Sequence, residues 1–151
     1  MGDFSKAIEQ FRAKVEIQLQ EKQPKAIKKA LNEAAKVLKD EVKPLVPTLS
    51  RSTGFRQKGT VKNNVRHRTR LFKDKMGGET TVRIRRTKGR KMARVSDNTK
   101  DRTDPFYWFM LDRGTRKMSG THFMERAWRA GHSKAIAKAK AVIESEMTKI
   151  K

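Results

Sequence analysis

The chain has 151 residues, of which 36% are charged and 35% hydrophobic, so we expect one domain with a small core. Its 38 lysines and arginines against 16 aspartates and glutamates give a net charge of +22, which favours anionic partners such as nucleic acid, anionic lipid or acidic protein. Cysteine is absent, which excludes disulfides and thiolate chemistry, and no apolar run approaches the roughly 20 residues needed to span a bilayer.

Residues 1–46 are predicted to form a pair of helices. Apolar side chains recur at every third or fourth position between Phe4 and Leu19, which places them on one helical face. Pro24 is predicted to open a second amphipathic helix, and Pro44 to end it.

Residues 47–102 form a basic zone with 18 lysines and arginines against 4 aspartates and glutamates, so +14 of the net +22 lies in about a third of the chain. Strict alternation over residues 80–85 predicts a half-buried strand with every second side chain turned inward. Residues 65–72 and 92–95 are further strand candidates, and residues 85–91 have the composition of a basic hairpin tip.

Residues 103–151 open with the most apolar stretch of the chain, Pro105–Leu111, whose length and aromatic content predict a buried strand. A turn is predicted at residues 112–117. A final helix is predicted from His122 to Ile150, with its apolar stripe weakened by Gly131.

These zones predict an α+β fold. We expect an N-terminal helical pair, a small antiparallel sheet with long basic loops, and a long C-terminal helix packed on the sheet. All 151 residues are expected to form a single domain, divided into a helical part (1–46), a basic strand and loop part (47–102) and an aromatic strand with the C-terminal helix (103–151).

Catalytic and metal sites are weakly supported. The three histidines, His67, His122 and His132, have no carboxylate or second histidine at ligand spacing, and the chain has no phosphate-binding glycine loop or nucleophile elbow. Four acids that a nuclease could use lie in a loop and at a strand end, where acids are usually solvated or turn-forming: Asp97, Asp101, Asp104 and Asp112. We therefore expect no enzymatic activity, no metal and no cofactor.

The basic zone predicts contact with a polyanion, although a solvated surface that keeps the protein soluble would have the same composition. Only Phe55 and Phe72 are aromatic in this zone, so single-strand stacking is not indicated and binding to nucleic acid should be non-specific and salt-dependent. The residues expected to contact the polyanion are Arg66, Arg68, Arg70, Arg83, Arg85, Arg86, Lys88, Arg90 and Lys91.

The order of these zones, with Val46-Pro47 and Thr53-Gly54 before the sheet, resembles a known family. The more specific residues are Gly-Thr-Arg-Lys-Met at 114–118 and Phe-Met-x-x-Ala at 123–127, which follow the aromatic segment. The chain resembles the small tail-component family of siphophages, whose members are described as tail-completion or head–tail joining (neck) proteins.

The resemblance implies a structural protein of the virion, assembled in the host cytoplasm and placed at the neck or the top of the tail as a tail terminator or a head–tail connector. Its implied partners are further copies of itself in a ring, the adjacent neck, connector and tail-tube proteins and, non-specifically, genomic DNA in the channel, with no membrane. A closed ring needs a heterologous interface. The residues expected at that interface are Tyr107, Trp108, Phe109, Met118, Phe123, Met124 and Trp128.

Two other functions stay open. The net charge alone is compatible with a stand-alone, non-specific nucleic-acid-binding protein of the ribosomal or nucleoid kind. A phage nuclease or an RNase toxin is the second alternative, and its activity would be lost on changing Asp104 or His122.

Overall fold

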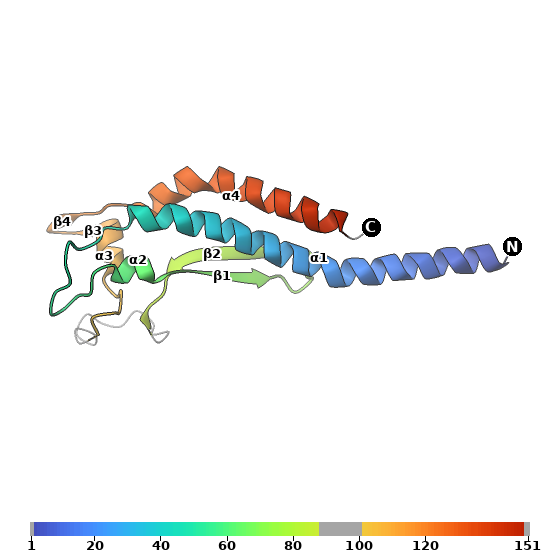
Figure 1. The fold of residues 1–151 in the computed structure, drawn as a ribbon, viewed down its shortest axis with the longest axis horizontal. Helices are drawn as coiled ribbons and strands as arrows, with labels where there is room; N and C mark the ends of the chain where they lie inside the picture. Colours follow the sequence, from blue (N-terminus) through green and yellow to red (C-terminus); the bar gives the residue numbers. More distant parts are fainter. Residues whose placement is uncertain (1, 88–100, 150–151) are drawn as a thin grey trace.

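The computed structural model describes residues 2–87 and 101–149. The fold is mixed α+β, as the sequence predicts, with two long helices and a two-stranded antiparallel sheet (Figure 1). The elements in chain order are α1 (Gly2–Leu45), α2 (Thr60–Asn63), β1 (Val65–Leu71), β2 (Gly78–Ile84), α3 (Trp108–Arg113), β3 (Gly114–Thr115), β4 (Met118–Ser119) and α4 (Phe123–Thr148).

Helix α1 is the centre of the molecule, with α4 on one side and the β1–β2 sheet on the other (Figure 1). Helix α4 runs antiparallel to α1. Ion pairs join the two helices near the middle of α4, at 2.7 Å between Lys134 and Glu41, and near its end, at 2.8 Å between Lys29 and Glu146. The N-terminal part of α1 extends past the end of α4 and past the sheet (Figure 1).

The N-terminal region is one continuous helix rather than the predicted pair, because α1 runs through Pro24 and ends at Leu45, one residue after Pro44. A proline inside a helix removes one backbone hydrogen bond and costs about 3 kcal/mol, but its fixed φ is compatible with a helix. Packing offsets this cost in the part of α1 that follows Pro24, where Ala26 and Ala30 are both buried.

Small side chains let α1 and α4 approach closely. Both helices bury alanines, and Gly131 in the middle of α4 is buried as well. A Cβ atom at Gly131 would lie 2.8 Å from Cγ of Glu41 and 3.3 Å from Cδ2 of Leu38, both on α1. The glycine that weakens the predicted stripe is therefore a position where α1 leaves no room for a larger side chain on α4.

Strands β1 and β2 confirm the two strands predicted at residues 65–72 and 80–85. They pair in register from Val65 opposite Ile84 to Leu71 opposite Gly78. The predicted strand at 92–95 and the end of the predicted hairpin tip, residues 88–91, lie outside the described residues.

The aromatic segment Pro105–Leu111 is not the predicted strand. Its first residues form a turn, and Trp108–Arg113 form α3. Trp108 and Leu111, three positions apart on this helix, both pack against the core. An apolar run of this length has no periodicity that distinguishes a strand from a short helix, which explains the error.

The predicted turn at 112–117 is replaced by the end of α3 and a tight hairpin between β3 and β4. Gly114 starts this hairpin with φ 88°, and a Cβ atom there would lie 2.6 Å from the backbone nitrogen of Gly120. Both the conformation and the close approach require glycine at this position.

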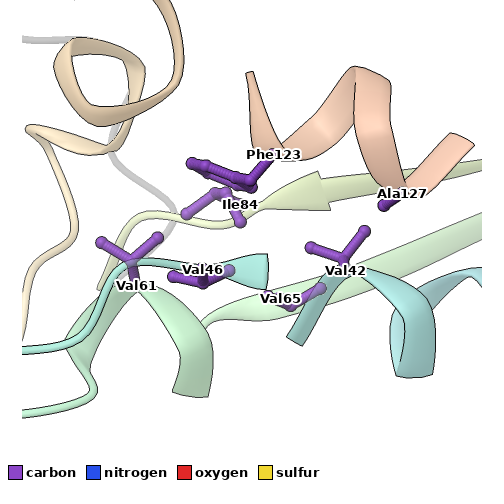
Figure 2. Close-up of a cluster of buried hydrophobic side chains, with 7 residues drawn as sticks. All are labelled: Val42, Val46, Val61, Val65, Ile84, Phe123 and Ala127. Carbon is purple, nitrogen blue, oxygen red and sulfur yellow. The ribbon is translucent and has the colours of Figure 1, made fainter. Parts of the chain in front are cut away.

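The apolar core lies where the end of α1 meets α2, the sheet and the start of α4. Phe123, fully buried at the first position of α4, lies next to Ile84 of β2 (Figure 2). The seven buried residues of this cluster are Val42, Val46, Val61, Val65, Ile84, Phe123 and Ala127 (Figure 2). Helix α4 thus reaches the sheet through its first turns and packs along α1 over the rest of its length.

Candidate polyanion-binding and assembly surfaces

The outer face of the β1–β2 sheet carries a row of arginines. Alternation along β1 exposes every second side chain, and all three exposed positions are arginine. Arg83 of β2 is exposed directly opposite Arg66, and Glu79 lies opposite Arg70. We call the four exposed side chains Arg66, Arg68, Arg70 and Arg83 the arginine face.

The arginine face is an arrangement that folding alone does not favour. Like charges directly opposite each other on neighbouring strands are destabilising, and Arg66 faces Arg83 in this way. Among the described residues, no side chain of the arginine face forms an ion pair within 4.0 Å. The guanidinium groups are therefore free to contact an anion.

The inner face of the sheet, which packs on α1, is partly polar. The hydroxyl of Thr69 donates a 2.6 Å hydrogen bond to Oδ1 of Asn32 on α1 and lies 3.0 Å from the hydroxyl of Thr80. His67 occupies the same face, where burial, together with the positive charges of Lys39 and Lys36, lowers the pKa of its imidazole below the ordinary value of 6.5. The position between the sheet and α1 therefore disfavours the charged form of His67.

Arg86 was expected to contact a polyanion, but the structure places it in the interior. Its side chain is 6% exposed, and its guanidinium binds the carboxylate of Asp104, which is 1% exposed, with Nη2–Oδ2 and Nε–Oδ2 distances of 2.5 and 3.1 Å. The amide of Thr87 donates a further hydrogen bond of 3.2 Å to Oδ1 of the same carboxylate. This ion pair joins the two chain segments that border residues 88–100.

The remaining residues expected to contact a polyanion divide into two groups. Arg85 is exposed immediately after β2, and its backbone amide donates a 2.9 Å hydrogen bond to the carbonyl of Asn64. Lys88, Arg90 and Lys91 lie outside the described residues. The structure thus brings together the four residues of the arginine face, with Arg85 at its end.

A family model matches residues 9–111, which is two thirds of the chain. Its description reads "Bacteriophage HK97-gp10, putative tail-component". The chain belongs to this family. No curated protein and no solved structure matches the chain.

The matched region of this phage tail component differs from the one on which the resemblance in the sequence depended. It runs from the N-terminal part of α1 through the sheet to the middle of α3. The motifs at 114–118 and 123–127 follow its end, so the family is established by the preceding residues.

The expected interface residues of the tail component do not form one surface. Phe123 is fully buried and belongs to the core, and Tyr107, Trp108 and Met124 pack against that core. Three further positions make up the set: Phe109 is half-buried, and Met118 and Trp128 are 44% and 57% exposed.

The aromatic residues before α3 form a contact with a cation. The guanidinium carbon of Arg56 lies 4.6 Å from the ring centroid of Phe106 and 4.7 Å from that of Tyr107. Burial raises the pKa of the Tyr107 hydroxyl above its ordinary value of 10.0, with Arg56 and a hydrogen bond with Thr60 acting in the opposite direction. The contact holds the 47–60 segment against α3 and borders a largely apolar cavity of about 320 Å³.

The acids considered for a nuclease have structural partners wherever they are described. Oδ1 of Asp112 accepts a 3.1 Å hydrogen bond from the amide of Met124, in the first turn of α4. Asp112 thus caps this helix, because His122, the residue before its first position, has a positive φ and makes no capping hydrogen bond with its side chain. Oδ1 of Asp101 accepts hydrogen bonds from the amide and hydroxyl of Thr103 at 2.9 and 2.7 Å. Asp97 lies outside the described residues.

Two searches of the described residues concern metals and membranes. No three histidine or acidic side chains gather closely enough there to hold a metal ion. None of the helices in that part of the chain has the length and apolarity that a bilayer span requires.

One surface was missed by sequence reasoning. The apolar face of residues 4–19 is predicted to belong to a helical pair, yet from Ile8 to Gln18 every side chain of α1 is exposed. Helical periodicity reveals an apolar face but not what covers it. Pro24 is the sequence feature that separates the exposed part of α1 from the covered part, which begins with Ala26.

Proposed function

We propose that this tail component is a tail-completion or neck protein, which forms a ring of identical subunits at the head–tail junction and performs no catalysis. The observation that carries the proposal is membership of the HK97-gp10 tail-component family over residues 9–111. The single domain of 151 residues would be one subunit of the ring, acting as a tail terminator or as a head–tail connector.

The surface of the protein supports an assembly role. The arginine face places four arginines on one side of the β1–β2 hairpin, and none of them forms an ion pair with another described residue. In a ring, this face would contact DNA in the channel or acidic surfaces of adjoining neck, connector and tail-tube proteins. Complementary charge mainly accelerates such docking and sets its orientation.

Microscopy of virions and a gene deletion test the proposal together. A reconstruction of the virion should show a ring of this protein between the head and the tail tube. Deleting its gene should leave filled heads and tails that fail to join. Normal tailed virions from the deletion, or a map that places the protein elsewhere, would contradict the proposal.

A second function, non-specific binding of nucleic acid by the isolated protein, is favoured by the arginine face. Neutralisation of several phosphates predicts duplex binding in the micromolar range at moderate salt, with log affinity falling steeply as log salt rises. Equal affinity for unrelated duplexes, together with absence of the protein from purified virions, would favour this function over the structural one.

A further inference from the structure

The N-terminal arm of α1, defined as residues 2–24, presents an apolar stripe to solvent. Ile8, Phe11 and Val15 are 40%, 68% and 38% exposed, and they step along the helix by three and four positions, which places them on one face. Leu19 continues this face and is half-buried. We call Ile8, Phe11, Val15 and Leu19 the arm stripe.

The arm stripe continues a face that is covered further along the same helix. Ala26 and Ala30 follow Leu19 at helical spacing and are 5% and 1% exposed. Near them, α4 reaches its end, and the Lys29–Glu146 ion pair closes the contact at 2.8 Å. This face of α1 stays apolar from Ala30 back to Ile8, but α4 ends near Lys29 and does not cover the arm stripe.

The charge of the arm differs from that of the rest of the chain. Residues 2–24 contain four basic and four acidic side chains, so the arm is neutral in a protein of net charge +22. Repulsion between like charges opposes the association of two copies elsewhere, but it does not oppose the approach of a neutral arm. A second copy of this chain is therefore a suitable partner for it.

Helix α4 carries a second exposed stripe. Trp128, Ile136, Ile143 and Met147 are 57%, 53%, 37% and 36% exposed, and their spacing of eight, seven and four positions places them on one face. We call these four residues the α4 stripe. The face of α4 that contains Ala127, Gly131 and Ala135 is a different one and is buried.

We propose that the arm stripe of one subunit packs on the α4 stripe of the next subunit. Each copy then has one donor helix and one acceptor helix, and the contact is heterologous. A heterologous contact generates a ring when the rotation between neighbouring copies closes, and only a closed ring covers both stripes of every copy. This inference rests on the proposed ring and identifies the surfaces that form it.

An antiparallel packing of the two stripes would repeat the relative direction that α1 and α4 have within one chain.

The test uses the full-length chain and a change in each stripe, with the oligomeric state measured by sedimentation. Phe11→Asp in the arm stripe and Ile136→Asp in the α4 stripe should each weaken self-association about tenfold or more, because each places a charge in an apolar contact. Ile17→Asp is the matched control, since Ile17 is 57% exposed on the opposite face of the same arm. Circular dichroism should show equal helicity in all three variants.

Mixing the two defective variants tests the heterologous geometry. The Phe11→Asp chain retains an intact α4 stripe, and the Ile136→Asp chain retains an intact arm. Their mixture should form a one-to-one complex that grows no further. If the arms paired with each other instead, the Ile136→Asp chain would assemble alone, and that result would overturn the proposal.

The outcomes separate this inference from the proposed function. Rings of the wild-type chain that persist unchanged in Phe11→Asp would overturn the inference and leave the ring intact. Open chains of the wild type that dissociate in Phe11→Asp would support the inference and contradict the closed ring. A wild-type chain that stays monomeric at the highest attainable concentration would contradict both.

Discussion

Asp104 shows how one carboxylate can be essential to a protein with a large excess of cations. Its side chain is 1% exposed, and its oxygens accept hydrogen bonds from the guanidinium of Arg86 and from the amide of Thr87. A buried ion pair stabilises little relative to apolar residues of the same size, but removal of one partner leaves an uncompensated charge in the interior. The role of Asp104 is therefore structural.

Replacing Asp104 by Asn should lower the free energy of unfolding by about 3–5 kcal/mol, because Arg86 then remains charged and buried without its carboxylate. Urea denaturation followed by circular dichroism measures the change. Glu144→Gln, which removes an exposed carboxylate on α4, should stay within about 0.5 kcal/mol of the wild type. The double change Arg86→Met with Asp104→Leu should recover much of the loss; an Asp104→Asn variant as stable as the wild type would refute the structural role.

His67 makes the stability of the protein depend on pH. Its pKa is lowered in the folded state by burial and by Lys39 and Lys36, so near pH 6.5 the unfolded chain binds more protons at this residue than the native protein does. The free energy of unfolding should therefore fall as the pH decreases from about 7.5 to 5.5. The variant His67→Gln should show a flatter dependence over this range, and equal slopes in the variant and the wild type would contradict the assignment.

At the scale of elements, the contact between α1 and α4 depends on small side chains such as Gly131, where a Cβ atom would meet Glu41 and Leu38. Gly131→Leu should lower the free energy of unfolding by about 1–3 kcal/mol, because the added atoms would overlap Glu41 and Leu38. Ala130→Leu is the control, since it adds the same side-chain type at an exposed position of the same helix and should change stability by less than about 0.5 kcal/mol. Thermal and urea unfolding of the two variants check this prediction, which fails if both are equally stable.

The elements with regular periodicity could be predicted from the sequence, and those without it could not. Strand β2 and helix α4 follow clear alternation and helical spacing, and both were found within two residues of their expected bounds. The apolar run that becomes α3 has neither pattern, because its side chains contact the core from a turn and a single short helix. Pro24 predicts the start of a second helix, but α1 continues through it as one helix because the residues that follow it are packed in the core.

The candidate surfaces could be predicted where they follow strand periodicity, but not where they depend on tertiary contacts. Strand alternation places Arg66, Arg68 and Arg70 on one exposed face, as strand periodicity requires. Composition alone could not separate Arg86 from these residues, because its burial depends on Asp104, which lies 18 positions away in the chain. Exposure of the arm stripe was equally beyond prediction, since it depends on where α4 ends.

At the scale of the whole molecule, charge and apolar surface lie in different places. The arm, which is neutral and carries the exposed arm stripe, extends from one end of the protein (Figure 1). The arginine face lies on the outer side of the sheet. Apolar stripes suit contacts between copies with the same large positive charge, whereas unpaired arginines suit an anionic partner. Contacts between copies and contacts with a polyanion can therefore form at the same time.

This separation predicts that binding to duplex DNA depends on where charge is removed. Changing Arg66, Arg68 and Arg70 together to Ser should weaken binding and reduce the slope of log affinity against log salt by about three units, because each lost phosphate contact removes about 0.9. Titrations of a labelled duplex at several salt concentrations measure both quantities. The fold should be unaffected, since the change also removes the repulsion between Arg66 and Arg83.

The control for this prediction removes the same net charge from another face. Lys22, Lys25 and Lys28 are exposed on α1, and changing all three to Ser gives the same total charge as the triple arginine variant. If the arginine face is the contact surface, the lysine variant should keep most of the wild-type affinity and salt slope. Equal losses in the two variants would instead show that DNA responds to the net charge of the protein, because a diffuse attraction does not distinguish one face from another.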